Sequence, residues 1–322
     1  MSFSTDVKQE IMSQRIKRES DAVAMLTAFA TSIGTLRFVS KTKSWGIHFV
    51  SENESTVLYI AKLASQYFNL EFDLSVVEHE RLNAVYKELL LYGDGMDDFL
   101  LTTGVMYEDE HGERNLGPVI PAKNIETETQ KRAFIRGAFL SCGTAVEPNK
   151  AYHVEFVLKN SVVADCLDEL IRYFGFMPRR TKRKQNEIIY IKEGEQLENF
   201  LALVGASSAM MHLANIRIEK QALNEANRSV NCITANLERA SKSALKQAED
   251  IRLLISEIGF DALPEQLKSV AEARINNYVM ALSDLADELG MGKSAVNYRL
   301  KKLREMADDV RNGTLKGKNN RG

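Results

Sequence analysis

The spacing of apolar residues changes along the chain and divides it into three kinds of region. In the long N-terminal part, helical stripes with apolar residues three and four apart alternate with short segments rich in β-branched and aromatic residues. The stripe over 162–175 and the segments 152–158 and 186–192 show the two patterns. Residues 217–256 are polar, with helical propensity and no strand signal. After a break at 261–267, a last helical unit follows.

The N-terminal part contains an internal repeat. TAFATSIGTLRF (27–38) resembles RGAFLSCGTAVE (136–147), and in each a helix of small residues ends at a glycine before a predicted strand. Further weak matches follow in the same order: 63–74 with 167–178, and 97–105 with 198–206. Because several weak matches keep one order, the sequence predicts a duplicated module, each copy built as helix, two strands, helix, strands, helix. The stretch 112–123 between the copies is predicted to be a linker.

The segment ALSDLADELGMGKSAVNYRLKKL (281–303) predicts two helices joined by a tight turn. Ser283 is expected to cap the first helix, and Gly290 stands where a left-handed turn residue is needed. This pattern is typical of a helix-turn-helix, whose second helix lies in the major groove of DNA. The candidate DNA-binding residues are Lys293, Ser294, Asn297, Tyr298, Arg299, Lys301 and Lys302.

The net charge of −2 says little about partners, but the charge is unevenly distributed. From Met291 to the last residue, nine basic residues oppose three acids, which favours double-stranded DNA as a partner. The same basic face also fits an ordinary helical hairpin with a solvated surface. By contrast, Glu52–Glu113 holds fourteen acids and three basic residues. A surface this acidic repels phosphate, which favours either contact with protein or shielding of the basic half.

The composition argues against several classes of site. The three cysteines are widely spaced without a CxxC pair, and the five histidines form no HExxH pattern. We therefore expect no disulfide framework, no metal and no cofactor. The first twenty residues are charged throughout and lack an apolar segment, so we expect a cytoplasmic, nucleoid-associated protein without a membrane partner.

Several segments resemble a known family. FIRGAFLSCG (134–143) and the stretch 175–206 resemble the LAGLIDADG homing-endonuclease module. The whole chain resembles the WhiA family of bacterial regulators of sporulation and cell division, on the segments MSFSTDVKQEI, NRSVNCITANLERA and KSAVNYRLKKL. The resemblance implies an α+β fold, with a duplicated LAGLIDADG-like αββαββα module followed by an all-α helix-turn-helix domain. We expect these divisions: a first, acidic repeat over 1–120, a second repeat over 121–216, a helical linker over 217–265, the helix-turn-helix domain over 266–313, and a disordered basic tail over 314–322.

The resemblance also locates the positions where active nucleases of this type carry acids. Those acids lie at the ends of two paired helices and bind the catalytic metal. Here the matching residues are Ile33 and Cys142, and neither offers the hard oxygen ligands that magnesium prefers. Cys142 is expected to be a small residue at a close helix crossing. We therefore predict no catalytic residue and no nuclease activity.

A basic stretch in the second repeat is a candidate for a secondary DNA contact. In the nucleases, the corresponding segment begins on the DNA-facing sheet. The residues are Arg179, Arg180, Lys182, Arg183 and Lys184. A solvated hairpin is an equally good interpretation of this stretch.

The leading hypothesis is a sequence-specific DNA-binding transcriptional regulator. The resemblance implies control of cell division, chromosome segregation or sporulation, and it makes a sigma factor or a cell-division protein a candidate second partner. Two alternatives stay open. One is a divergent metal-dependent DNA endonuclease, and the other is a protein-interaction adaptor that uses the acidic repeat.

Overall fold

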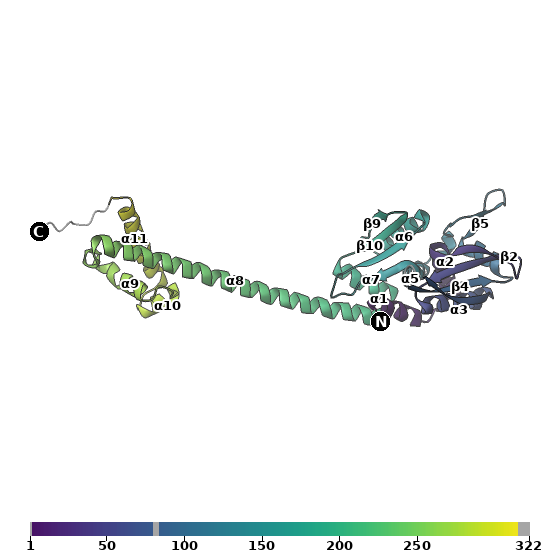
Figure 1. The fold of residues 1–322 in the computed structure, drawn as a ribbon, viewed down its shortest axis with the longest axis horizontal. Helices are drawn as coiled ribbons and strands as arrows, with labels where there is room; N and C mark the ends of the chain where they lie inside the picture. The colour runs from purple at the N-terminus through teal and green to yellow at the C-terminus, as the bar shows by residue number, and fades with distance from the viewer. Residues whose placement is uncertain (1, 80–83, 315–322) are drawn as a thin grey trace. The chain divides into compact units, whose positions relative to one another are not determined.

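The computed structural model describes residues 2–79 and 84–314, and the chain divides into two compact units, 1–220 and 221–322 (Figure 1). Each unit has its own hydrophobic core. Of the predicted tail, only Thr314 belongs to the described residues.

The first unit contains the predicted duplication. After α1 (Phe3–Ser13), the first repeat consists of α2 (Glu19–Ile33), β1 (Thr35–Val39), β2 (Ser44–Ser51), α3 (Glu54–Phe68), β3 (Glu71–His79), β4 (Ala84–Tyr92) and α4 (Met96–Thr103). The second consists of α5 (Glu128–Cys142), β7 (Gly143–Ala145), β8 (Val154–Leu158), α6 (Ser161–Tyr173), β9 (Arg179–Arg183), β10 (Asn186–Ile191) and α7 (Gly194–Val204). The predicted order αββαββα is confirmed in both copies.

The two sheets have the same antiparallel topology. Their strand orders are β1-β2-β4-β3 and β7-β8-β10-β9, so β3 and β9 are equivalent edge strands. One face of each sheet packs on helices, because alternate residues such as Ile47 and Phe49 in β2, or Phe156 in β8, are fully buried. The opposite face of each sheet is called the open face below.

Helices α2 and α5 join the two repeats into a single core. Phe29 of α2 and Phe139 of α5 are fully buried in the same cluster. Gly137 marks the close approach: a Cβ there would lie 2.6 Å from the carbonyl oxygen of Met25, so the crossing requires glycine. Since each repeat covers apolar surface of the other, neither is expected to fold when its partner is deleted.

The predicted linker between the repeats is ordered. It contains β6 (Arg114–Leu116), which pairs with β5 (Met106–Glu108), and the short 3₁₀ helix Ala122–Asn124. The buried amide of Asn124 donates to Thr27 Oγ1 at 2.8 Å and to the Thr102 carbonyl at 2.7 Å. These buried hydrogen bonds fix the connection against the first repeat.

The second unit is helical. It consists of the later part of α8 (Ser207–Ile258), the 3₁₀ helix Phe260–Ala262, α9 (Glu265–Asn276), α10 (Leu282–Glu288) and α11 (Lys293–Arg311). The end of α8 was predicted to be linker, but its Ile251 and Leu254 lie in the core with residues of α9 and α11. Because residues 217–256 are mostly polar, these few apolar residues do not form a pattern that predicts a core helix. Within residues 2–79 and 84–314, none of the helices is both long and apolar enough to span a bilayer.

Candidate nucleic-acid interface

The turn between α10 and α11 has the predicted glycine geometry. Gly290 has a φ of +59°, and the following Met291 N–H donates to the Ala286 carbonyl at 2.9 Å. The predicted cap at Ser283 is wrong, because the N-cap of α10 is Ala281, two residues earlier, and Ser283 lies inside the helix. The Ser283 hydroxyl instead bonds the Asp284 carboxylate at 3.1 Å.

A compact apolar layer holds α11 in place. Val296, Leu300 and Leu303 are buried against Leu285 and Ala286 of α10. This stripe recurs at intervals of three and four residues, so it fixes which side of α11 faces the core. The remaining side of the helix is free to meet a partner.

Buried Arg274 of α9 braces the approach to α10. Its side chain is 1% exposed, and it donates to the Met280 carbonyl at 2.6 Å and to the Asn277 carbonyl at 3.3 Å. Burial lowers the pKa of this guanidinium. The two hydrogen bonds hold the connection that leads into the helix-turn-helix.

The seven candidate residues of α11 fall into two groups. Lys293, Ser294, Asn297, Tyr298 and Lys301 are exposed. Among the described residues, no carboxylate lies within ion-pair distance of Lys293 or Lys301.

The other two candidates already have partners nearby in the chain, one in the turn before α11 and one within the helix. The half-buried Arg299 donates to the sulfur of Met291. Lys302 forms an ion pair with Glu305 at 2.8 Å and lies 5.9 Å from the centre of the Tyr298 ring. Because of these contacts, Arg299 and Lys302 are less available to a ligand than the exposed group.

Arg304 is a basic residue of α11 that is not among the seven candidates predicted from the sequence. It is exposed and lies three residues after Lys301 and seven after Asn297, which places it on the same side of α11. Lys246 of α8 borders the same surface, together with Asn297 and Lys301. The helical spacing on α11 was a usable signal for Arg304, whereas no local pattern connects Lys246 to α11.

In the second repeat, β9 carries its basic residues on two faces. Arg180 stands opposite Ile189 of β10, and Lys182 stands opposite Glu187. Ile189 and Glu187 are buried on the helix side of the sheet. Arg180 and Lys182 therefore lie on the helix side, away from the open face.

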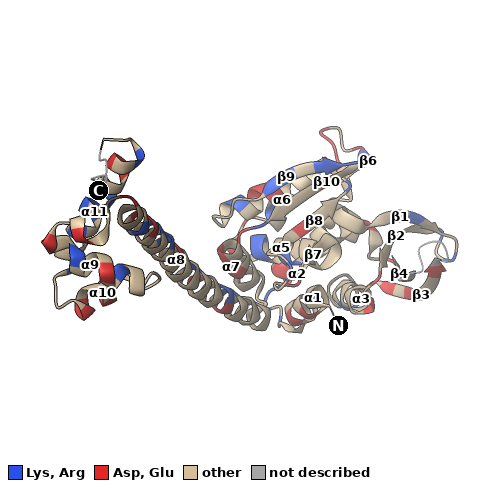
Figure 2. Ribbon diagram, turned by 60° about the vertical axis from the view of Figure 1, so that its left-hand side comes forward, with Lys and Arg blue, Asp and Glu red and all other residues tan. Residues whose placement is uncertain are grey.

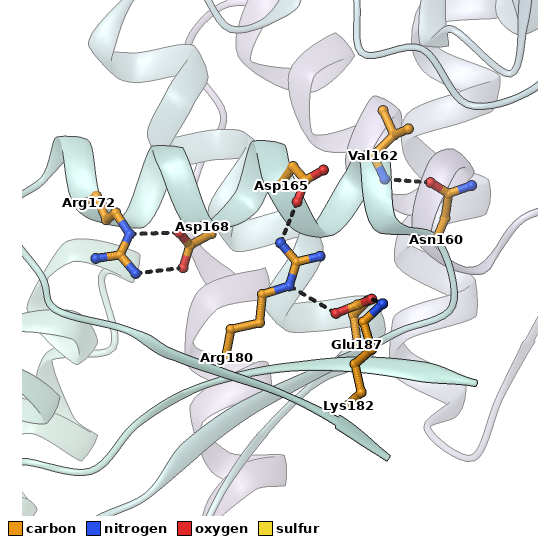
Figure 3. A network of polar contacts seen from close by, with 8 residues as sticks. All are labelled: Asn160, Val162, Asp165, Asp168, Arg172, Arg180, Lys182 and Glu187. Atoms are coloured by element: carbon orange, nitrogen blue, oxygen red, sulfur yellow. Dashed lines mark hydrogen bonds and ion pairs between the residues drawn. The ribbon is translucent and has the colours of Figure 1, made fainter. Parts of the chain in front are cut away.

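Figure 3 shows how these two cations are engaged. Arg180 Nε donates to Glu187 at 2.9 Å, its other nitrogen reaches Asp165 of α6, and Lys182 Nζ contacts Glu187 at 2.8 Å. Lys182 and Arg180 lower the pKa of the Glu187 carboxyl. These interactions tie β9 to β10 and α6.

The other cations of β9 remain available. Arg179 and Arg183 alternate with the engaged pair and stand opposite Tyr190 and Asn186, on the open side of the strand pair. Lys184 lies in the turn with a φ of +55°. Of the five candidate residues, Arg179, Arg183 and Lys184 form no ion pair with a described residue, and the secondary DNA contact stays a prediction.

The first repeat carries acids where the second carries these cations. On the open face of its sheet, Asp73 of β3 accepts from Tyr92 at 3.1 Å, and Glu88 of β4 contacts His48 at 3.2 Å. Figure 2 marks acids along both strands. Glu80 and Arg81, which belong to the acidic segment, lie outside the described residues.

The ends of α2 and α5 do not fit a divalent metal ion. Ile33 is a partly buried hydrocarbon, and burial raises the pKa of the Cys142 thiol to about 11. The Lys8 ammonium of α1 donates to the Leu140 carbonyl at 3.1 Å, which places a cation at the end of α5. In the described part of the chain, no cluster of three or more His, Cys, Asp or Glu side chains could hold a metal.

A doubled LAGLIDADG-like scaffold with a helix-turn-helix domain after it defines a class of DNA-binding proteins. Comparisons with known proteins narrow this class. The WhiA LAGLIDADG-like domain matches residues 131–223, and the WhiA C-terminal HTH domain matches 226–307. Proteins called "Probable cell division protein WhiA" are 37% identical over 97% of this chain in Clostridium botulinum (strain Eklund 17B / Type B), and 36% identical over 98% in Clostridium perfringens (strain 13 / Type A). Each relative is covered over its full length. The chain belongs to the WhiA family.

Solved structures agree on the fold. The crystal structure of full-length DUF199/WhiA from Thermatoga maritima has a TM-score of 0.61 at 22% identity, covering 96% of this chain and 98% of that one. The N-terminal LAGLIDADG domain of DUF199/WhiA has a TM-score of 0.50 at 18% identity, covering 63% of this chain and 90% of that one. The predicted fold class is therefore confirmed.

Proposed function

We propose that this chain is a sequence-specific transcriptional regulator that binds duplex DNA through α11 and does not cut it. The carrying observation is the exposed set Lys293, Ser294, Asn297, Tyr298 and Lys301 on a helix whose opposite side is locked in the core. Asparagine suits the adenine edge and lysine suits guanine, and hydroxyl groups bind phosphate or base. Because its relatives are called probable cell division proteins, we propose that its targets include genes of cell division. The resemblance to the WhiA family adds chromosome segregation and sporulation to this proposal.

We propose that the protein does not cleave DNA because of the residues at the ends of α2 and α5. Phosphodiester cleavage in LAGLIDADG nucleases uses acids at the helix ends to hold metal ions, and here those positions carry a hydrocarbon and a protonated thiol. We expect purified protein to leave plasmid DNA intact in the presence of magnesium or manganese. Metal-dependent cleavage that a nearby substitution such as Glu147→Gln abolishes would contradict this part of the proposal.

Genome-wide mapping of bound sites tests the regulatory function. Asn297→Ala is expected to redistribute or remove the bound sites, since it deletes a base contact but no charge. Ser256→Ala is a matched control, because its exposed hydroxyl bonds the α8 backbone and lies outside the α10–α11 surface. If Asn297→Ala and wild type occupied the same sites with equal strength, α11 would not be the reading element.

A second role as a protein-recruiting surface is favoured by the first repeat. On edge strand β3, Phe72, Leu74 and Val76 are each more than 40% exposed, on the side of the sheet that is apolar elsewhere. Acids flank them along the strand, so the surface suits a basic protein rather than DNA. Crosslinking from positions on β3 should capture a sigma factor or a division protein. Crosslinks from β3 to promoter DNA would contradict this role.

A further inference from the structure

A cleft lies within the second unit, between α8 and α11. It has a volume of about 280 Å³ and is bordered by Ser243 and Lys246 of α8 and by Asn297, Lys301 and Arg304 of α11. The α8 residues come from the segment predicted to be linker. Asn297 belongs to both the cleft and the exposed face of α11, so the two surfaces are continuous.

Three cations on the rim of this cleft form no close ion pair with a carboxylate of the described residues. In the described residues, no carboxylate lies within 4.0 Å of the Lys246, Lys301 or Arg304 side-chain nitrogens. This contrasts with Arg180 and Lys182 of β9, which share carboxylates. Three unpaired cations around one concave site raise the local potential and favour an anion with several acceptor oxygens.

The floor of the cleft points to a ligand that brings a hydrogen-bond donor or a bound water. Asp250 is 1% exposed, and one of its oxygens is bound by Arg311. Within residues 2–79 and 84–314, its other oxygen and the buried Oε1 of Gln247 have no hydrogen-bond partner. A buried acceptor without a donor is costly, and a water held between this floor and an anion on the rim would satisfy it.

We propose that Lys246, Lys301 and Arg304 hold a backbone phosphate of duplex DNA in this cleft. The inference rests on the proposed DNA-binding function and deepens it. Phosphates flank the groove that a recognition helix enters, and contacts to them fix the register of the helix. Lys301 thereby becomes a phosphate ligand, while Lys293, Ser294 and Asn297 are left to meet the bases. Lys246 becomes a DNA contact from outside the two-helix motif.

Salt titration of duplex binding tests the proposal. Lys246→Ala and Arg304→Ala are each expected to lower the slope of log K against log salt by about 0.9. Extrapolated between about 1 M and 0.15 M salt, that slope corresponds to roughly a fivefold loss of affinity. The loss should be equal on a target duplex and on an unrelated duplex, because a phosphate carries no sequence information. Lys242→Ala is the matched control, since Lys242 is an exposed lysine of α8 that does not border the cleft.

The possible results distinguish the proposed phosphate contact in the cleft from the proposed DNA-binding function. If wild type binds duplex DNA and the slopes of Lys246→Ala and Arg304→Ala match that of Lys242→Ala, the cleft proposal is overturned and the proposed function stands. If wild type shows no duplex binding even at low salt, the proposed function fails. A separate titration with inorganic phosphate, followed by ³¹P NMR, tests whether the cleft binds a small phosphate-containing ligand instead of the DNA backbone. Saturable phosphate binding that Lys246→Ala removes, with duplex affinity unchanged, would assign the cleft to a small phosphorylated ligand and overturn the DNA contact.

Discussion

Strand β9 and helix α11 are both dense in arginine and lysine, yet their side chains do different things. On β9, Arg180 and Lys182 lie on the helix side of the sheet and share the carboxylate of Glu187. On α11, Lys293 and Lys301 are exposed without an ion-pair partner among the described residues. A run of basic residues in a sequence therefore gives the charge of a segment but not how much of it a ligand can reach. The strand alternation and the neighbouring acids decide that.

Reversing the charges of the exposed lysines of α11 should have the largest effect on duplex affinity. We expect Lys293→Glu combined with Lys301→Glu to reduce duplex affinity at least about 100-fold. The change removes a base contact of Lys293, which contributes about 1–3 kcal/mol, and a phosphate contact of Lys301, and it places two negative charges against the DNA. Fluorescence anisotropy at fixed salt measures this loss. Arg239→Glu with Lys242→Glu changes the same charge on exposed residues of α8 and serves as the control. If the control pair weakened binding as much, net charge rather than the α11 surface would control affinity.

Removing the available cations of β9 should cost less. We expect Arg179→Ala with Arg183→Ala to lower affinity about 30-fold or less and the salt slope by at most about 2, since two phosphate contacts are the most these residues can make. The same anisotropy titration applies. If this pair of substitutions lowered duplex affinity as much as the charge reversal on α11, β9 and α11 would contribute equally to DNA binding. The contrast between them would then be wrong.

Breaking the β9 ion-pair network should affect stability rather than binding. Glu187→Gln removes the carboxylate that Arg180 and Lys182 share, and we expect the melting temperature of the first unit at pH 7 to fall by about a few degrees. The folded-state pKa of Glu187 is lowered, so its stabilising effect is present above its unfolded-state pKa and is lost as pH falls through the folded-state value. Acidification should therefore narrow the difference between wild type and Glu187→Gln. A constant difference from pH 7 to about pH 3 would argue against the network.

Placing acids at Ile33 and Cys142, the positions that match the metal-binding acids of active nucleases, should have the smallest effect, with no gain of metal binding. We expect Ile33→Asp with Cys142→Asp to bind no manganese in isothermal titration calorimetry, because the Lys8 ammonium already lies at the end of α5. Adding Lys8→Met should allow binding. Circular dichroism checks that both variants are folded. Equal manganese affinity with and without Lys8 would show that this lysine plays no part in excluding the ion.

The fold was largely predictable because its signals are local and repeated. The glycines after α2 and α5, the period-two strands and the turn at Gly290 each reflect a backbone requirement that sequence records directly. The share of α8 in the second core was missed, since Ile251 and Leu254 are isolated in a polar stretch. The Ser283 cap failed for a smaller reason, a shift in where α10 begins.

The candidate site was predictable only in part. The spacing on α11 identified Lys293, Asn297 and Lys301 as exposed because one helix determines their direction. The separation of Arg179 from Arg180 depends on the register between β9 and β10, and the position of Lys246 depends on how α8 packs on α11. Both are tertiary facts that spacing along one segment does not contain.

Lys8 gives the first unit a property that a metalloprotein lacks. A divalent ion at a helix end exchanges with solvent, so its occupancy follows the supply of free metal and falls when a chelator is added. The ammonium of Lys8 is covalently attached to the chain and cannot dissociate, and its hydrogen bond to the Leu140 carbonyl is made within the fold itself. The contact between α1 and α5 should therefore be equally stable in a metal-starved cell and in a metal-rich one.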